Sequence, residues 1–333
     1  MQNKQIGVIG SGSWATAMIK MLTDNLLDKT VLWWVRKPED LQYILEYKHN
    51  PTYLSAVEVK LSEEQISTDA AQLIRRSDIV ILNTPAAYLK AALKNVKPED
   101  FENKIVVSAI KGIVPDENLV VGEYLMEYYN VPLENIVVVG GPCHAEEVSL
   151  EKLSYLTLAS KNLDHAEEMA KFLRNRYIKT IISADIFGVE YGAVLKNIYA
   201  LAGGICHGLG FGDNFQAVLV SNAIREMETC VDVIDPQPRD INHSAYLGDL
   251  LVTAYSQFSR NRTFGNMIGK GYSVQSAQLE MNMVAEGYYA SACIQRIIQK
   301  FDLKMPICDA VYKILYQQSP ALPTIKTLAD SLT

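Results

Sequence analysis

The sequence has few cysteines, and their arrangement suits neither a disulfide framework nor a metal centre. There are five in 333 residues, an odd number with no C-x-x-C pair. In a chain of this length, such cysteines are typical of reduced thiols in a cytosolic protein. We therefore expect a cytoplasmic protein without a bound metal.

Long apolar runs and an excess of positive charge are also missing. Residues 193–212 form one of the most apolar long windows, but Lys196, Asn197 and His207 interrupt it, so it is not a transmembrane helix. A strand pattern begins almost at the first residue, which leaves no room for a signal peptide. The net charge of −7 argues against a general nucleic-acid binder and a basic membrane-surface protein. We expect no nucleic-acid partner and no membrane insertion.

Apolar residues, in contrast, are plentiful, at 49% of the chain against 21% charged residues, as in soluble globular proteins. The length predicts about two domains. Strands alternate with helices and glycine-containing turns over residues 1–185, which predicts an α/β, Rossmann-type domain with a doubly wound parallel sheet. From residue 186 only helical periods continue, so residues 186–333 are predicted to form an all-helical domain.

A glycine-rich turn follows the first predicted strand. Residues 10–15, Gly10-Ser-Gly12-Ser-Trp-Ala, read G-x-G-x-x-A between a strand and an apolar helix, the setting in which this pattern binds a dinucleotide. Gly10 would make the tight turn, Gly12 would let the backbone approach a pyrophosphate, and the helix N-terminus would face the phosphates. The alternative is a purely structural turn. We expect NAD or NADP to bind here.

The end of the second predicted strand bears on the choice between these cofactors. An acidic residue there binds the ribose 2′-hydroxyl of NAD, whereas an arginine suits the 2′-phosphate of NADP. Here Arg36 and Lys37 come first, and Glu39 follows only after a proline. The pattern favours NADP or the use of both dinucleotides; the alternative is a cationic strand end that binds nothing.

Two further strand ends are suited to ligand contact, because ligands of doubly wound sheets bind outside the carboxyl ends of the strands. The strand that begins at Lys104 ends in Lys111-Gly112. The strand over residues 136–140 is followed by Gly141-Pro-Cys143-His-Ala145 and then by two glutamates, which predict the start of a helix.

Lys196 lies in a predicted helix over residues 188–204, away from the face formed by the apolar residues. Gly192, Ala193, Ala200 and Gly203 flank it at helical spacing, and such small residues leave room for another molecule beside a long cation. The alternative is a solvated surface lysine on a helix weakened by glycine.

A second helix, predicted over residues 248–262, has a polar stripe on an otherwise apolar surface. Its members are Asp249, Thr253, Ser256 and Arg260. The stripe lacks the mixture of lysines and glutamates that is typical of a solvent-exposed helix face, so it predicts one wall of a polar pocket. Arg260-Asn261-Arg262 adds donors suited to a phosphate. The alternative is the solvent-exposed face of an amphipathic helix.

Together these motifs resemble the bacterial-type NAD(P)-dependent glycerol-3-phosphate dehydrogenases from end to end of the chain. The similarity is carried by Gly10–Ala17, Val31–Trp33, Lys111-Gly112, Gly141–Glu147, Lys196-Asn197, Gly248–Thr253, Ser259–Arg262 and Val284–Gly287. It implies a Rossmann domain followed by a helical substrate domain. It also implies the interconversion of dihydroxyacetone phosphate and sn-glycerol 3-phosphate with NAD(P)H, for glycerophospholipid synthesis. Since two-domain Rossmann enzymes are commonly dimeric, we expect a homodimer.

The resemblance, with the motifs above, also suggests a role for each site residue. The expected catalytic residues are Lys196 as acid/base, Asp249 to hold its ammonium and Asn197 to orient the substrate. The expected cofactor site consists of Gly10, Gly12, Ser13, Trp14, Arg36, Lys111, Ala145, Arg260, Val284 and Glu286. The expected substrate site consists of Lys111, Gly141, Cys143, Lys196, Asp249, Thr253, Ser259, Arg260 and Asn261.

The chain departs from the family pattern in two places. Cys143 stands where the family usually has serine or threonine, which weakens a hydroxyl hydrogen bond to substrate, and residues 235–248 form a longer approach to Asp249. Two other functions stay open. One is a related reductase of a hydroxyacid or ketopantoate, which needs no phosphate site. The other is a protein that senses NAD(P) without turnover, and such a protein would tolerate loss of Lys196.

Overall fold

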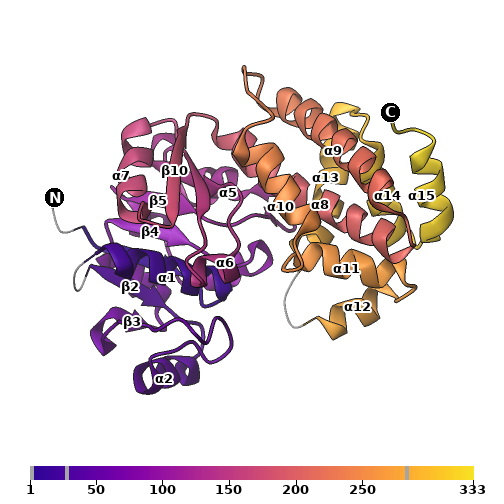
Figure 1. Ribbon diagram of the computed structural model, residues 1–333. Helices are drawn as coiled ribbons and strands as arrows, with labels where there is room; N and C mark the ends of the chain where they lie inside the picture. Colours follow the sequence, from indigo (N-terminus) through magenta and orange to yellow (C-terminus); the bar gives the residue numbers. More distant parts are fainter. Residues whose placement is uncertain (1–3, 27–29, 282–284) are drawn as a thin grey trace. The chain divides into compact units, whose positions relative to one another are not determined.

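The computed structural model describes residues 4–26, 30–281 and 285–333. The chain divides into two compact units, the first formed by Met1–Ile110 with Val121–Ile186 and the second by Lys111–Val120 with Phe187–Thr333. The first unit contains the large sheet, and the second is helical apart from one short hairpin (Figure 1). The grouping of residues 111–120 with the helices was not anticipated from the sequence.

Strands and helices alternate in the first unit. Its strands are β1 (Ile6–Ile9), β2 (Val31–Trp34), β3 (Ile66–Ser67), β4 (Ile79–Leu82), β5 (Ile105–Ser108), β8 (Ile136–Gly140), β9 (Ser154–Ala159) and β10 (Ile178–Ser183). Its α-helices are α1 (Ser13–Asn25), α2 (Pro38–Tyr47), α3 (Ala70–Arg76), α4 (Leu89–Ala92), α5 (Val121–Tyr129), α6 (Ala145–Ser149) and α7 (Leu163–Leu173). Short 3-10 turns are η1 (Glu63–Gln65), η2 (Ala86–Tyr88), η3 (Pro98–Phe101) and η4 (Leu133–Asn135).

The strand order of the sheet is β10-β9-β8-β5-β4-β1-β2-β3. From β3 to β8 every neighbouring pair is parallel, and this is the order of a dinucleotide-binding doubly wound sheet. β9 runs antiparallel to β8 and pairs in parallel with β10. The connections reverse direction between β1 and β4, where such sheets bind ligands beyond the carboxyl ends of their strands. The predicted α/β class is confirmed.

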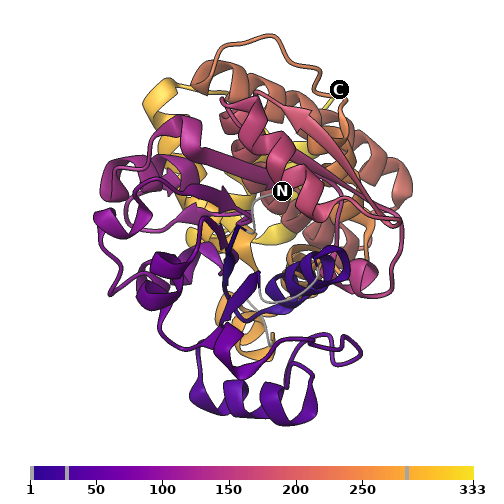
Figure 2. The same ribbon diagram turned by 90° about the vertical axis from the view of Figure 1, so that its left-hand side faces the viewer.

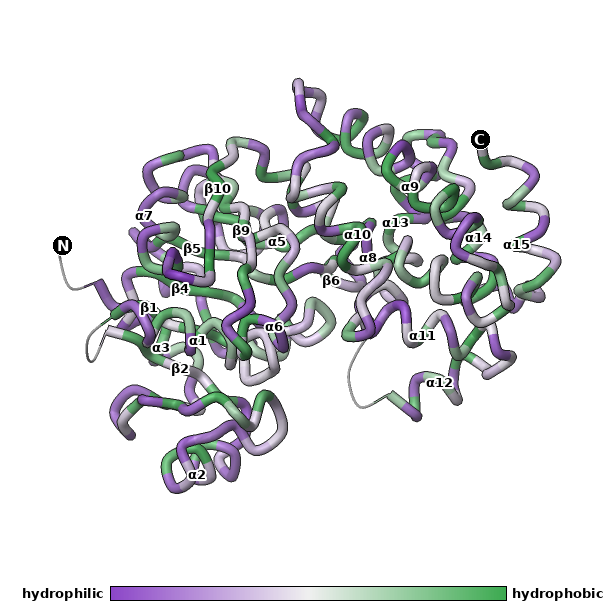
Figure 3. The backbone as a smooth tube through the Cα atoms, in the orientation of Figure 1, coloured by the Kyte–Doolittle hydropathy of each residue, from purple (hydrophilic) through white to green (hydrophobic). Residues whose placement is uncertain are grey.

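The strands at this switch point are buried on both faces because helices cover both. All residues of β1 and β4 are buried, as expected for parallel strands, and β4 is green in the hydropathy view (Figure 3). Ile6 and Val8 share a core with α1, whereas an added Cβ on Gly7 would lie 2.6 Å from Leu73 of α3. Helix α2 lies beyond the β3 edge in two perpendicular views (Figures 1 and 2).

The second unit consists of helices and a small antiparallel hairpin of β6 (Ile113–Val114) and β7 (Leu119–Val120). Its helices are α8 (Ile186–Gly208), α9 (Asp213–Ile234), α10 (Asp249–Tyr255), α11 (Arg260–Gly269), α12 (Val274–Glu280), α13 (Glu286–Phe301), α14 (Pro306–Tyr316) and α15 (Ala321–Ala329), with a π-helical turn η5 (Ser244–Gly248). Among the described residues, no helix combines the length and apolarity that a membrane crossing requires.

Helices α8 and α11 pack backbone against backbone. Gly204 and Gly208 of α8 face Gly265 and Gly269 of α11, and a Cβ added to any of the four would lie 2.2–2.4 Å from a carbonyl oxygen of the other helix. The four-residue spacing puts both glycines of each helix on one face. The close approach therefore sets the separation between the helix that carries Lys196 and the helix that begins at Arg260.

The prediction of a single helix over residues 248–262 is wrong. α10 ends at Tyr255 and α11 begins at Arg260. The Ser256 hydroxyl accepts from the backbone N–H of Phe258, and the Ser259 hydroxyl caps α11 by accepting from the N–H of Arg262. Serine competes for backbone hydrogen bonds in this way and is a preferred N-cap. The four residues of the polar stripe therefore do not share one helix face.

Candidate active site

The glycine-rich turn lies directly after β1, at the switch point of the sheet. Gly10 has φ +146°, and an added Cβ would lie 2.5 Å from the carbonyl oxygen of Asn83 after β4, so glycine is required. Gly12 is the N-cap of α1, and apart from its neighbours in the chain no atom of the described residues lies within 4 Å of the position that its Cβ would take. Among the described residues no side chain caps α1, and its first turn has no acid. The turn therefore fits an anionic pyrophosphate.

The other cofactor and substrate residues predicted in the first unit follow strand ends at the same edge. Arg36 is exposed just beyond β2. Gly141, with φ +97°, and the buried Cys143 follow β8. Ala145 begins α6, as the two glutamates after it predicted. Because these strands run parallel to β1 or β5, their carboxyl ends share one edge with the glycine-rich turn.

This edge also holds polar residues to which the sequence analysis gave no role. Asn83 Nδ2, Thr84 Oγ1 and Ser108 Oγ are buried without a hydrogen-bond partner in the described ranges. They stand at the ends of β4 and β5. Buried polar groups without a hydrogen-bond partner are rare in proteins. Three of them at the ends of neighbouring strands make this edge of the sheet suitable for a polar ligand. The sequence Asn83-Thr84-Pro85, immediately after an apolar strand, could have indicated this polar strand end.

In the second unit two lysines share one buried aspartate. Asp249, the first residue of α10, places Oδ2 3.1 Å from Lys111 Nζ, and its Oδ1 accepts a hydrogen bond from Lys196 Nζ. Lys196 is only 3% exposed and Asp249 only 1%. The alternative of a solvated surface lysine is therefore wrong, and the expected ion pair between Lys196 and Asp249 is present.

The small residues on α8 make room for neighbouring side chains. An added Cβ on Gly192 would lie 3.1 Å from the ring of Tyr246, and one on Gly203 would lie 2.5 Å from Gln216 Nε2. Tyr246 belongs to η5 and Gln216 to α9. At these two positions the prediction of open space for another molecule is wrong.

Burial and charge oppose each other in the lysine–aspartate cluster. Burial lowers the pKa of Lys196 to about 7, with the Asp249 carboxylate opposing this shift and the Lys111 ammonium adding to it. Burial alone would raise the pKa of Asp249, but the two ammonium groups hold it below its ordinary value. With both lysines protonated and Asp249 ionised, these three side chains together carry one net positive charge. Such a cluster suits proton transfer and a developing negative charge.

Two buried asparagines connect this cluster to the neighbouring helices. Asn197 Nδ2 donates to the Lys111 carbonyl at 2.7 Å, and Asn261 Nδ2 donates to Asn197 Oδ1 at 2.9 Å. Asn261 Oδ1 accepts from the backbone N–H of Gly287 at 2.9 Å. This relay fixes the orientation of both amides and joins residue 111 to α8, α11 and the first turn of α13.

The remaining predicted residues of this unit lie at helix starts or within α10. The Thr253 hydroxyl donates to the Asp249 carbonyl at 2.6 Å, and the Ser259 hydroxyl caps α11. Arg260 and Glu286 are the half-buried first residues of α11 and α13. Val284 lies outside the described residues. The structure thus brings Lys111, Lys196, Asn197, Asp249 and Asn261 into one connected group.

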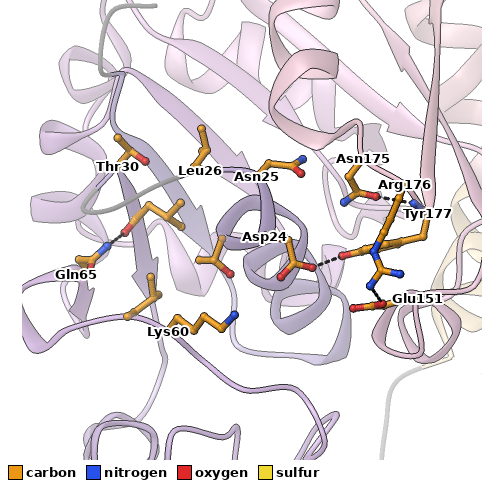
Figure 4. Close-up of a pocket in the computed structure, with 13 residues that line it drawn as sticks. Asp24, Asn25, Leu26, Thr30, Lys60, Gln65, Glu151, Asn175, Arg176 and Tyr177 are labelled. Atoms are coloured by element: carbon orange, nitrogen blue, oxygen red, sulfur yellow. Dashed lines mark hydrogen bonds and ion pairs between the residues drawn. The ribbon is translucent and has the colours of Figure 1, made fainter.

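A surface cavity of about 620 Å³ lies elsewhere in the first unit, at the C-terminal end of α1. Tyr177 donates to Asp24 at 2.6 Å and Arg176 pairs with Glu151, while the Lys60 ammonium points toward Asp24 (Figure 4). The 13 residues of α1 separate this cavity from the glycine-rich turn, a distance of about 20 Å at the rise of an α-helix. The cavity is distinct from the dinucleotide edge.

The first unit has a dinucleotide-binding sheet, and the helical second unit has a buried lysine with a pKa of about 7. Together these features are typical of one class of protein, the two-domain NAD(P)-dependent oxidoreductases. Two family models match the chain. The N-terminal model of NAD-dependent glycerol-3-phosphate dehydrogenase matches residues 5–166, and the C-terminal model matches residues 185–326. The chain belongs to the NAD-dependent glycerol-3-phosphate dehydrogenase family.

Individual relatives agree with this family. The chain is 35% identical over 329 residues to glycerol-3-phosphate dehydrogenase (NAD(P)+) of Bacillus velezensis, covering 98% of this chain and 94% of the relative. The Bacillus subtilis protein of the same name is 33% identical with the same coverage. The fold is that of glycerol-3-phosphate dehydrogenase from Coxiella burnetii, with a TM-score of 0.89 at 24% identity over 98% of both chains. The predicted family, enzyme class and NAD(P) cofactor are confirmed.

Proposed function

We propose that this protein interconverts dihydroxyacetone phosphate and sn-glycerol 3-phosphate with NAD(P)H. The observation that carries the proposal is the buried cluster of Lys111, Asp249 and Lys196. A lysine with a near-neutral pKa beside a second ammonium suits the reduction of a ketone on an anionic substrate. The names of the relatives support this choice of substrate.

In this mechanism Lys196 is the proton donor. Bound NAD(P)H supplies the hydride that reduces the ketone carbon. The Lys196 ammonium stabilises the negative charge that develops on the ketone oxygen and then protonates it. Asp249 orients this ammonium and favours its charged form, while Lys111 adds a second positive charge. In the reverse direction neutral Lys196 accepts the proton of the alcohol.

We assign the substrate phosphate to the start of α11. The Arg260 guanidinium suits a phosphate, and the helix N-terminus favours an anion. Since the Ser259 hydroxyl caps the helix, we assign it to holding Arg260 in place. Asn197 and Asn261 each have one amide N–H outside the relay, and we assign these to substrate oxygens.

On the cofactor side, we assign the pyrophosphate to the backbone of Gly10, Gly12, Ser13 and Trp14, and the 2′-phosphate of NADP to Arg36. The open space at Gly12 and the uncapped start of α1 support the first assignment. The exposed position of Arg36 supports the second. The contacts expected of Gly141, Cys143, Ala145, Thr253, Val284 and Glu286 stay predictions, as do cofactor contacts of Lys111 and Arg260.

Oxidation of NADH and of NADPH by the purified protein tests the function. We expect turnover with dihydroxyacetone phosphate. Dihydroxyacetone, which lacks the phosphate, should have a kcat/KM lower by about a hundredfold or more, since charge-assisted hydrogen bonds to Arg260 are lost. Turnover of ketopantoate but not of the triose phosphate would favour the related reductase. Dinucleotide binding without any turnover would favour the sensor.

The rate should depend on pH through Lys196. Because the donor must carry its proton, kcat for reduction should be constant below a pKa of about 7. Above it, kcat should fall by about tenfold per pH unit. Oxidation of glycerol 3-phosphate needs the neutral amine and should rise through the same range. In Asp249→Asn the carboxylate that raises the Lys196 pKa is missing, so the inflection should move to lower pH. An unmoved inflection in this variant would argue against Lys196 as its source.

Three further expectations accompany this function. The product would supply glycerophospholipid synthesis, the protein would work in the cytoplasm, and it would form a homodimer. The five cysteines are buried thiols rather than disulfides, which suits a reducing compartment. The lipid role, the cytoplasmic location and the homodimer stay predictions.

A further inference from the structure

Three side chains hold the glycine-rich turn by its carbonyl groups. Trp33 Nε1 donates to the Gly10 carbonyl at 2.7 Å and Asn50 Nδ2 donates to the Ser11 carbonyl at 3.2 Å. Thr16 Oγ1 donates to the Gly12 carbonyl at 3.0 Å. All three donors lie outside the six-residue motif. The backbone carbonyl groups of Gly10, Ser11 and Gly12 therefore each accept a hydrogen bond from a side chain.

Anchoring a carbonyl also orients the amide that follows it. In a trans peptide the C=O of one residue and the N–H of the next point in opposite directions. Fixing the carbonyls of residues 10–12 therefore fixes the N–H groups of Ser11, Gly12 and Ser13. These amides belong to the segment that faces a pyrophosphate in this motif. Because glycine has unusual conformational freedom, the anchors preorganise a turn that would otherwise lose entropy on binding.

Asn50 is the centre of this arrangement. It is 3% exposed, and besides the Ser11 carbonyl its Nδ2 reaches Thr16 Oγ1 at 2.9 Å. Its Oδ1 accepts from the backbone N–H groups of Thr52 and Tyr53, each at 3.0 Å. Both amide hydrogens and the carbonyl oxygen are thus in use. The side chain ties the segment after α2 to the turn, both directly and through Thr16.

We propose that Asn50 is a positioning residue for the dinucleotide, which holds the phosphate-binding turn in its binding conformation together with Thr16. The inference rests on the proposed function only in that NAD(P) is the cofactor. The substrate does not enter it. In Asn50→Ala the Ser11 carbonyl loses its donor, and the N–H groups of Thr52 and Tyr53 lose their acceptor.

The dissociation constants of NADH and NADPH, measured by fluorescence titration, test this proposal. For Asn50→Ala we expect both to rise by about tenfold to a hundredfold, with a parallel rise in the dinucleotide KM. At saturating dinucleotide, kcat and the triose phosphate KM should change by less than about threefold, because these anchors touch neither Lys196 nor Arg260. A general loss of structure would instead lower kcat as well. The exposed Asn95 of the same unit supplies a control, Asn95→Ala, which should match wild type.

Thr16 provides an independent pair of variants in case Asn50→Ala does not fold. Thr16→Val keeps the shape but removes the hydroxyl that links Asn50 to Gly12, so dinucleotide binding should weaken. Thr16→Ser keeps the hydroxyl and should restore binding. Unchanged dissociation constants in folded Asn50→Ala, or equal binding by Thr16→Val and Thr16→Ser, would overturn the proposal. Wild type that binds NADPH without reducing the triose phosphate would overturn the proposed function and leave this inference standing.

Discussion

Replacing Lys196 with alanine is expected to lower kcat for dihydroxyacetone phosphate reduction by about a thousandfold or more. The substitution removes the proton donor together with the charge that stabilises the developing oxyanion. Asp249 keeps its ion pair with Lys111, so no unpaired carboxylate is left in the core. The dissociation constant of NADPH should stay within about threefold of wild type, since the glycine-rich turn belongs to the other unit.

Two companion variants sharpen this result. Lys196→Arg keeps a positive charge but exchanges its proton poorly, because arginine stays protonated at all accessible pH values. It should therefore remain far below wild type. Lys326 is an exposed lysine on α15, and Lys326→Ala should retain full activity. A Lys196→Ala protein with kcat within about tenfold of wild type would rule out Lys196 as the proton donor.

The second large effect is expected on stability, at the contact between α8 and α11. Gly265→Ala would place a Cβ 2.2 Å from the Leu201 carbonyl oxygen. The nearest atoms belong to the backbone of α8, so a change of side-chain rotamer cannot relieve the clash and the two helices must separate. We expect a loss of about 3 kcal/mol in the free energy of unfolding, which thermal or denaturant unfolding without ligand would measure. Any folded fraction should also have reduced kcat/KM, because the helices position Lys196 and Arg260.

Gly212 offers the matched control within the same unit. In the described part of the chain, no atom beyond the two adjacent residues lies within 4 Å of the position of an added Cβ there. Gly212→Ala should therefore cost less than about 1 kcal/mol, the scale of an N-cap change. Equal unfolding midpoints for Gly265→Ala and Gly212→Ala would show that the two helices can move apart without penalty.

The parts of the fold that were predictable depend on local patterns. Apolar strands that end in glycine turns predicted the sheet, and the G-x-G-x-x-A pattern predicted the turn at the end of β1. The ion pair between Asp249 and Lys196 was expected from their chemistry. The break between α10 and α11 had a signal in Ser259, a good N-cap, but the helical spacing of the polar stripe concealed it.

Other features depend on contacts between distant residues and leave no local pattern. Lys111 follows a strand of the first unit, yet residues 111–120 group with the helical unit. The relay joins Asn197 to residues 86 positions before it and 64 positions after it. Small residues such as Gly192 and Gly203 reveal a close approach, but the sequence does not tell whether a ligand or a neighbouring side chain comes close.

The glycine contact between α8 and α11 has a consequence for substrate choice. Where side chains separate two helices, a change of rotamer can widen or narrow the gap, but two backbones in van der Waals contact have no such adjustment. The separation of the backbones that carry Lys196 on α8 and Arg260 at the start of α11 is therefore fixed. If these residues protonate the substrate oxygen and bind its phosphate as proposed, we expect a preference for substrates with one particular spacing of carbonyl and phosphate, and a lower kcat/KM for sugar phosphates that are one carbon longer.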